Sequence, residues 1–194
     1  MKEPIILIGG GGHCKSCIDV IETGSRFEVA GIVDMKKNIG QKVLGYEIIA
    51  SDEDLDKLTK KFHYFLITLG QIKSPERRIE IFNLLDKLNV TMPVVISPLA
   101  HVSKHAKIGR GTIIMHHAIV NVSAIIGNNC IINNKALIEH DCVIGNHCHI
   151  STGCIVNGGV KTGTGTFIGS GAVCREYVTI PDFGFVKANS IYKG

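Results

Sequence analysis

The chain has 194 residues, of which 45% are hydrophobic and 20% charged, and it carries 21 basic and 17 acidic side chains. This composition predicts one or two globular domains with substantial apolar cores. The net charge of +4 comes without a basic run, which argues against nucleic-acid binding. Because no long apolar run and no secretory leader are present, we expect a cytoplasmic protein without membrane insertion.

The first 95 residues are expected to alternate strands with helices. Predicted strands cover 4–8, 28–33 and 64–69, predicted helices cover 13–23, 52–61 and 75–88, and a short extended piece follows Gly45. Such alternation favours a small parallel sheet with right-handed βαβ crossovers. We therefore predict an α/β domain over 1–95 that amounts to half a Rossmann fold.

A glycine loop, Gly9–Gly12, joins the first predicted strand to the first predicted helix. Glycines at such a turn let the backbone approach a diphosphate, and the helix N-terminus supplies free N–H groups. Asp34, at the end of the second strand, suits a ribose hydroxyl or a base edge. Cys14 replaces the third glycine of the dinucleotide fingerprint, so the loop favours a mononucleotide, and a plain tight turn is the alternative.

A six-residue repeat runs from Ile96 to Phe185. Positions spaced by six from 96 to 180 carry Ile or Val in 13 of 15 cases, and the residue four places further on is always small. This period fits neither an α-helix nor a flat strand. It predicts a parallel β-helix over 96–194, in which three hexads make one turn, with about five turns in all.

The seven cysteines are expected to be structural. Those in the repeat fall on its core positions: Cys130, Cys142, Cys148, Cys154 and Cys174. Cys14 and Cys17 form a C-x-x-C at the start of a predicted helix, and no second pair follows at zinc-finger spacing. We expect neither disulfides nor a bound metal.

Among the nine histidines, two stand out. His140 lies in the middle of the repeat with Asp141 directly after it, and His149 is nine residues downstream on an adjoining face. The others in the repeat and His63 are expected on the surface: His101, His105, His116, His117 and His147.

Several motifs carry a resemblance to a known family. They are the run Gly9-Gly10-Gly11-Gly12-His13-Cys14-Lys15-Ser16-Cys17-Ile18-Asp19, the pairs Val33-Asp34 and Leu69-Gly70, the hexads, and Glu139-His140-Asp141. Together they resemble the PglD/NeuD-type nucleotide-sugar acetyltransferases of the hexapeptide-repeat superfamily. The resemblance implies a left-handed β-helix that forms a homotrimer, acetyl-CoA bound between neighbouring β-helices, and an N-terminal domain that binds a nucleotide-linked amino sugar. The most similar patterns belong to enzymes that acetylate a 4-amino group on a UDP-linked deoxy sugar.

The resemblance also implies three groups of site residues. His140 matches the general base and Asp141 its acidic neighbour, here shorter than the usual Glu. The residues implied for acetyl-CoA are His149, Ser170 and Ala188. Those implied for the nucleotide sugar are Gly11, Gly12, His13 and Gly70, with Asp34 and Met35 at the uracil end, where relatives often carry two acids.

The chemistry of the residues agrees with an amide-forming transfer. An amine that attacks a thioester must be neutral and must lose a proton, and histidine is the natural acceptor near neutral pH. A carboxylate on the other ring nitrogen fixes its tautomer. Because the thioester is already activated, we expect direct transfer in a ternary complex, with a backbone N–H stabilising the oxyanion.

Other functions stay open from the sequence. An O-acetyltransferase acting on sialic acid or a related sugar fits the same motifs. A γ-class carbonic anhydrase-like zinc enzyme also uses a β-helix trimer, but the residue five beyond His140 is Gly145, which breaks the usual histidine spacing. A purely structural role is a third possibility, because one fold serves several functions.

Overall fold

The computed structural model describes all residues 1–194, in two compact units. The N-terminal unit comprises Met1–Gly70 and Glu80–Pro93, and the coil unit comprises Gln71–Ile79 and Val94–Gly194. The sequence predicted one boundary at residue 95, whereas the structure groups the short segment Gln71–Ile79 with the coil. This segment covers part of the coil, where Gln71 contacts His149.

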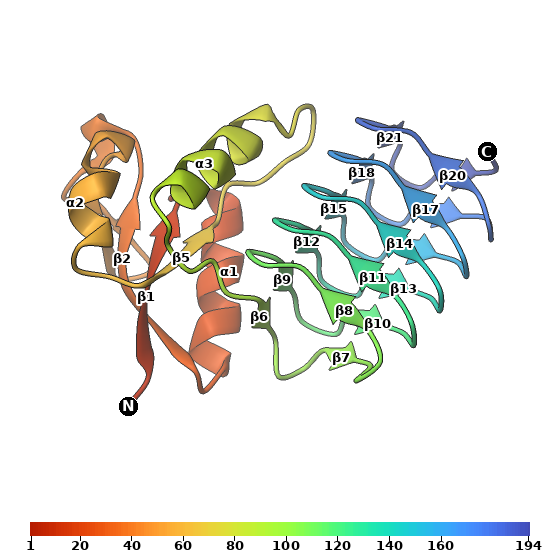
Figure 1. The fold of residues 1–194 in the computed structure, drawn as a ribbon, viewed down its shortest axis with the longest axis horizontal. Coiled ribbons are helices and arrows are strands. Elements are labelled where there is room, and N and C mark those ends of the chain that lie inside the picture. The colour runs from red at the N-terminus through yellow and green to blue at the C-terminus, as the bar shows by residue number, and fades with distance from the viewer. The chain divides into compact units, whose positions relative to one another are not determined.

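The N-terminal unit is a five-stranded sheet with the order β3-β4-β2-β1-β5 (Figure 1). Its strands are β1 (Glu3–Ile8), β2 (Phe27–Val33), β3 (Lys42–Val43), β4 (Tyr46–Ala50) and β5 (Tyr64–Ile67). Its helical segments are α1 (Gly12–Thr23), η1 (Lys36–Asn38), η2 (Asp52–Asp54), α2 (Leu55–Thr59) and α3 (Glu76–Lys87), the last beginning in the coil unit. β1 pairs in parallel with β2 and β5, and β2 with β4, which confirms the Rossmann-like prediction.

One element differs from the expectation. The extended piece after Gly45 is the second strand of a hairpin, because β3 pairs antiparallel with β4. Leu44 and Gly45 make its turn with φ of 49° and 90°. A two-residue loop with positive φ at both positions matches the right-handed twist of the flanking strands.

The coil unit contains seventeen strands of two residues each, β6 to β22, arranged in three parallel sheets (Figure 1). Face 1 holds β6 (Val95–Ile96), β9 (Ile113–Ile114), β12 (Ile131–Ile132), β15 (His149–Ile150), β18 (Phe167–Ile168) and β21 (Phe185–Val186). Face 2 holds β7 (His101–Val102), β10 (Ile119–Val120), β13 (Leu137–Ile138), β16 (Ile155–Val156), β19 (Val173–Cys174) and β22 (Ile191–Tyr192). Face 3 holds β8 (Lys107–Ile108), β11 (Ile125–Ile126), β14 (Val143–Ile144), β17 (Lys161–Thr162) and β20 (Thr179–Ile180). Paired residues on neighbouring strands are 18 positions apart, so three hexads make one rung, as predicted.

The core of the coil follows the hexads. Every repeat position from Ile114 to Ile180 is buried, including the two exceptions, Thr162 and Cys174. The five cysteines of the coil are fully buried and free, which confirms their structural reading. Ile96 departs from the pattern with 43% exposure, since it lies on the first rung. Full burial of one such aliphatic side chain contributes about 1.5–3 kcal/mol, so the stacked column stabilises the coil.

The corners of the coil share one backbone conformation. From Gly111 to Asn189, every sixth residue has a φ between 52° and 70°. Five of these positions are glycine, and Asp141 and His147 are among the others. Asn and Asp tolerate this left-handed region better than most side chains. The corner geometry is therefore imposed by the repeat, whatever side chain each corner carries.

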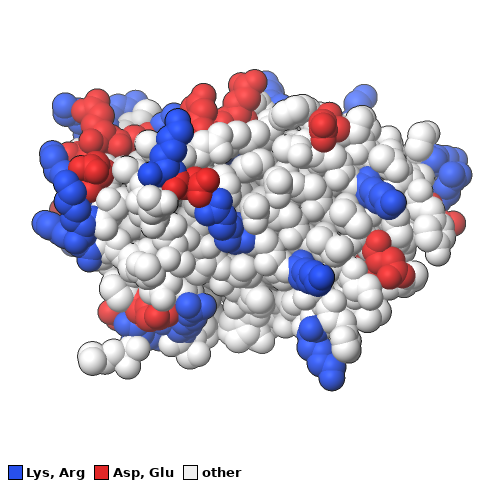
Figure 2. Space-filling view, in the orientation of Figure 1, with Lys and Arg blue, Asp and Glu red and all other residues white.

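The charged side chains are scattered. Figure 2 shows Lys and Arg interspersed with Asp and Glu on the face in view, without a basic stripe. No helix reaches the length and apolarity that crossing a bilayer requires.

Candidate functional site

His140 and Asp141 lie at the corner between face 2 and face 3, just after β13. The His140 Nδ1 is 2.8 Å from Asp141 Oδ2, and the two side chains are 47% and 66% exposed. The ring's Nδ1–H donates to the carboxylate, which leaves Nε2 as the nitrogen that can accept a proton. Asp141 reaches this position with a φ of 60°, the left-handed corner conformation.

An open groove surrounds the His140 ring. It is lined by Glu139, His140, Asn157, Gly158, Glu176 and Tyr177. A Cβ on Gly158 would lie 2.8 Å from both Cε1 and Nε2 of His140, so the ring rests against this glycine. A Cβ on Gly159 would collide with the Tyr177 ring in the same way. Two glycines on one rung therefore make the space that the two rings occupy.

Glu139 is held by its own contacts. Its Oε2 accepts from Asn121 Nδ2 at 2.8 Å and from the His140 backbone N–H at 3.3 Å. The sequence interpretation did not single out the remaining groove residues. The 18-residue length of a rung could have identified them, because Gly158 and Glu176 lie one and two rungs after His140 at the same corner.

The residues predicted for acetyl-CoA divide between two places. Ser170 and Ala188 are exposed at the corner between face 1 and face 2, on successive rungs, and Ser170 Oγ is 2.9 Å from Ser151 Oγ. His149 lies on β15 of face 1 and is only 7% exposed. Within one chain, face 2 thus separates Ser170 and Ala188 from His140.

His149 is buried beneath the segment Gln71–Ile79. Its Nδ1–H donates to the Gln71 carbonyl oxygen at 2.6 Å, and its Nε2 accepts from Asn133 Nδ2 at 3.1 Å. Burial lowers the pKa of His149 to about 4, an effect to which the charge of Arg78 adds. His149 therefore stays neutral well below the pH at which a free imidazole takes up a proton.

His147 was expected on the surface, and this prediction is wrong. Its side chain is 9% exposed, and its Nδ1 accepts from Asn129 Nδ2 at 2.9 Å. Asn129 Oδ1 in turn accepts from Arg78 Nη2 at 2.6 Å. Burial, followed by the charge of Arg78, lowers the pKa of His147 to about 4. The cause is again the segment Gln71–Ile79, which lays Arg78 over this corner of the coil.

In the N-terminal unit, the predicted sugar-binding residues gather at one edge of the sheet, where β1, β2 and β5 end. Added Cβ atoms on Gly11 and Gly12 would meet nothing within 4 Å, so space is open above both. The first turn of α1 has neither a side-chain cap nor an acidic residue, so no carboxylate opposes an anion at this helix N-terminus. A Cβ on Gly70 would lie 3.6 Å from His13 Cβ, so these two line the same edge.

Asp34 connects the glycine loop to the end of β2 by hydrogen bonds. Its Oδ2 accepts from the Gly10 N–H at 2.6 Å, and its Oδ1 accepts from the Met35 N–H at 2.6 Å and from Asn38 Nδ2 at 3.3 Å. Both oxygens therefore hold the glycine loop and the end of β2. A carboxylate has further lone pairs, so the predicted contact to the nucleotide stays a prediction.

No three His, Cys, Asp or Glu side chains of the chain converge as a metal site would require. His140 and Asp141 form a close acid–base pair in the coil. The arrangement can accept a proton at His140 Nε2 in a groove that a substrate can enter.

Comparisons with known proteins agree with this arrangement. Residues 4–85 match the PglD N-terminal domain, and residues 123–158 match the bacterial transferase hexapeptide repeats. No curated protein sequence matches the chain significantly. The chain thus combines a PglD N-terminal domain with hexapeptide repeats.

Solved structures resemble the chain over nearly its whole length. The acetyltransferase domain of PglB from Neisseria gonorrhoeae is 26% identical, with a TM-score of 0.90 over 99% of this chain and 92% of that one. The same domain in complex with acetyl coenzyme A is also 26% identical, with a TM-score of 0.88 over 100% and 95%. PerB from Caulobacter crescentus, in complex with CoA and GDP-perosamine, is 23% identical, with a TM-score of 0.68 over 98% and 91%, and shows the same fold.

Proposed function

We propose that this chain, in which a PglD N-terminal domain precedes bacterial transferase hexapeptide repeats, is an acetyl-CoA-dependent N-acetyltransferase of nucleotide-linked amino sugars. The observation that carries the proposal is the His140–Asp141 pair, at 2.8 Å, in an open groove of the coil. The likeness to the PglB acetyltransferase domain, which binds acetyl coenzyme A, supports the cosubstrate. The glycine loop, with open space above Gly11 and Gly12, supports a nucleotide in the N-terminal unit.

In the proposed reaction, the neutral amine of the sugar attacks the thioester carbonyl carbon, and a C–N bond forms. His140 Nε2 accepts the amine proton while Asp141 holds the opposite ring nitrogen. The tetrahedral intermediate then collapses, the C–S bond breaks, and the coenzyme A sulfur takes up the proton. The products are the acetamido sugar and coenzyme A, and no residue of the chain becomes acylated.

A homotrimer would complete this site. The outward residues of face 2 form an apolar ladder in register: Ile119, Leu137, Ile155, Val173 and Ile191. Ile119, Ile155 and Ile191 are 40%, 37% and 67% exposed, which leaves apolar surface to be covered. Because His140 lies at one edge of face 2 and Ser170 at the other, they can share one acetyl-CoA only across two chains. Sedimentation should give three chains per particle, and a monomer at micromolar concentration would contradict the intersubunit site.

The preferred substrate in this proposal is a UDP-linked sugar with a 4-amino group, and acetylation of a sugar hydroxyl is the alternative. The test is a panel of UDP-, GDP- and CMP-linked sugars with an amino or a hydroxyl group at the acceptor carbon, assayed with acetyl-CoA by thiol release. We expect the UDP-linked 4-amino sugar to have the highest kcat/KM. Equal or better turnover of a GDP-amino sugar would change the nucleotide, and preference for sialic acid would establish O-acetylation.

The role of the glycine loop is tested separately. Replacing Gly12 with Val puts a side chain into the open space where a diphosphate would lie. We expect weaker binding of the nucleotide sugar with an unchanged KM for acetyl-CoA. Lys15→Ala, on the same helix, serves as the control. If Gly12→Val leaves the nucleotide-sugar affinity unchanged, the loop is only a tight turn.

The carbonic anhydrase-like and structural alternatives make different predictions. Stoichiometric zinc in the purified protein, together with CO2 hydration, would favour the zinc enzyme. Absence of thiol release with every sugar of the panel would favour a structural role.

A further inference from the structure

Three residues on successive rungs form a column at the corner between face 2 and face 3: His140, Gly158 and Glu176. The His140 ring leans towards the next rung, since its Cε1 and Nε2 would lie 2.8 Å from a Cβ on Gly158. Nε2 therefore points along the column towards Glu176, while Asp141 holds Nδ1 at 2.8 Å. The backbones of His140 and Glu176 are two rungs apart, about 10 Å, which leaves room for a small polar group between the two side chains.

The Tyr177 ring bounds the same groove from the opposite direction. A Cβ on Gly159 would collide with Cδ1 and Cε1 of Tyr177, so this ring leans back over the middle rung. Tyr177 has a φ of 58°, which a large side chain rarely adopts, and it is 74% exposed. The rings of His140 and Tyr177 both line the groove of about 520 Å³, and they approach its middle rung from opposite ends.

Two glutamates line this groove, and one of them is already engaged. Glu139 Oε2 accepts from Asn121 Nδ2 and from the His140 backbone N–H. Glu176 is exposed, and its carboxylate forms no hydrogen bond or ion pair with another side chain of the chain. A carboxylate binds a cationic donor more strongly than a neutral one. The groove therefore presents an uncompensated negative charge close to a proton acceptor.

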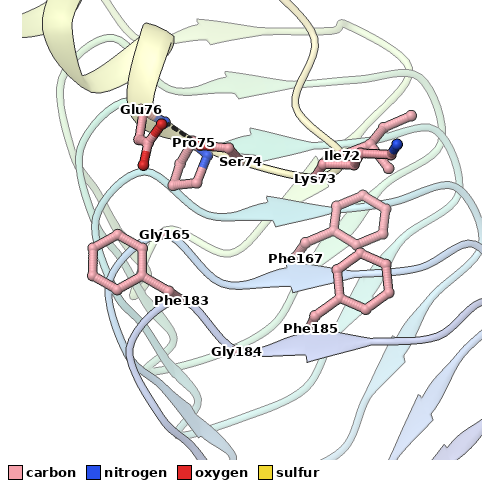
Figure 3. Close-up of a pocket in the computed structure, with 10 residues that line it drawn as sticks. All are labelled: Ile72, Lys73, Ser74, Pro75, Glu76, Gly165, Phe167, Phe183, Gly184 and Phe185. Carbon is pink, nitrogen blue, oxygen red and sulfur yellow. Dashed lines mark hydrogen bonds between the residues drawn. The ribbon is translucent and has the colours of Figure 1, made fainter.

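A second cavity of the coil unit, of about 230 Å³, lacks this combination. Figure 3 shows its three aromatic side chains, Phe167, Phe183 and Phe185, beneath the segment that carries Lys73 and Glu76. The acid of this cavity shares it with a cation, and no histidine lines it. A cationic group would therefore meet an uncompensated carboxylate beside a base in the groove at the corner between face 2 and face 3.

We infer that Glu176 binds the protonated amino group of the acceptor sugar and so selects an amine over a hydroxyl. This role rests on the proposed function for the identity of the acceptor. Below its own pKa, the sugar amine arrives as an ammonium ion, and a charge-assisted hydrogen bond is about twice as strong as a neutral one. A sugar hydroxyl in the same place gains less from the same carboxylate. Glu176 is thus a substrate-binding residue, whereas His140 is the proposed base.

The bound ammonium must become a neutral amine before it can attack. One proton leaves to solvent through the open groove, and the neutral amine then attacks the thioester carbonyl carbon. The second N–H proton passes to His140 Nε2 and from there to the coenzyme A sulfur. Glu176 keeps its charge throughout, so its contribution belongs to binding and should appear in KM more than in kcat.

Glu176→Gln tests this role because it removes the charge and keeps the shape of the side chain. Calorimetry with a UDP-linked 4-amino sugar and its 4-hydroxy counterpart, and with the same pair linked to GDP, measures binding without the reaction. Below the pKa of the amine, Glu176→Gln should raise the Kd of the amino sugars about 5- to 50-fold. The Kd of the hydroxy sugars should change less than about threefold.

Asp182→Asn is the matched control. Asp182 lies at the corner between face 3 and face 1, outside the residues that line the groove, and its Oδ1 accepts from the Thr164 N–H. Asn removes the same unit of charge as Glu176→Gln and keeps this side-chain oxygen. The Kd values of the amino sugars should therefore stay within about threefold of those of the unchanged protein.

The pH dependence separates this role from a structural one. The ion pair exists while the amine is protonated, so the Kd ratio of Glu176→Gln to the unchanged protein should fall towards one as the pH rises through the amine pKa. Glu176→Asp, which keeps the charge, should show a smaller loss. A ratio that is constant with pH, or an equal loss for amino and hydroxy sugars, would overturn the role of Glu176. So would an unchanged protein that binds amino and hydroxy sugars equally below the amine pKa.

Failure of the proposed function would be distinguishable from failure of this role. If Glu176→Gln selectively weakens binding of the amino sugars but no sugar gives thiol release, Glu176 binds the amine and the proposed reaction is wrong. If the amino sugars are acetylated and Glu176→Gln keeps their KM below the amine pKa, the proposed function stands and Glu176 is a solvated surface residue.

Discussion

Replacement of Gly158 with Ala tests whether the observed position of the His140 ring is the working one. The added Cβ would lie 2.8 Å from Cε1 and Nε2 of His140, closer than real Cβ contacts allow. The ring must therefore turn away, and this costs little because the side chain is 47% exposed. The φ of Gly158 is outside the left-handed region, so Ala brings no backbone strain.

The expected result is a large loss of rate with an intact fold. Displacement of a catalytic group by about 1 Å can cost about 10²-fold, and complete loss of its proton transfer costs about 10²- to 10⁴-fold. Gly158→Ala should thus lower kcat at least about 10²-fold while the melting temperature changes little. Thiol release and thermal unfolding measure the two quantities. Val122→Ala, at the same corner one rung before His140, is the control. A Gly158→Ala protein with kcat within about threefold of the unchanged chain would refute this reasoning.

Three further predictions follow from the histidines. His140→Ala should lower kcat about 10²- to 10⁴-fold with both KM values nearly unchanged, and retention of most activity would remove His140 as the base. Asp141→Asn should lower kcat less than His140→Ala does, because Asn tolerates the left-handed corner and its side-chain oxygen can still accept a hydrogen bond from the His140 ring. A loss of kcat equal to that of His140→Ala would contradict an orienting role for Asp141. His147 and His149 have pKa values of about 4 when folded against 6.5 in the free side chain, so the unfolded chain protonates first on acidification. The free energy of unfolding should therefore fall as the pH is lowered from 6.5 to 4, by about 2 kcal/mol per histidine near pH 5. If urea unfolding gives the same free energy of unfolding at pH 7 and at pH 5, the two histidines are not buried in the neutral form.

The hexads made the coil predictable because each rung touches only its neighbours, so a local period determines the packing. The buried column from Ile114 to Ile180 and the exposed His140–Asp141 pair follow from that rule. The burial of His147 does not follow from the repeat. Its neighbour Arg78 comes from outside the repeat, and no period within the coil reports a segment that folds back onto it.

The N-terminal unit was predictable to a similar degree. The alternation of strands and helices placed Asp34 and the glycine loop at the same edge of the sheet, as found. The sequence could not show that Asp34 already accepts hydrogen bonds from Gly10 and Met35, because these contacts depend on how the ends of β1 and β2 approach. It also missed β3, whose two residues are too short to carry a pattern.

The repeated left-handed corner limits how this chain can change its length. An insertion of one hexad would move every later residue to the next face, so that Ser170 and Ala188 would leave the corner between face 1 and face 2. An insertion of 18 residues would restore the faces but raise those residues by one strand spacing, about 4.8 Å. Length variation in descendants of this chain should therefore come in whole rungs, and it should be found beyond the last site residue or before the first. Only an insertion or deletion of whole turns keeps every later residue of the coil on its own face.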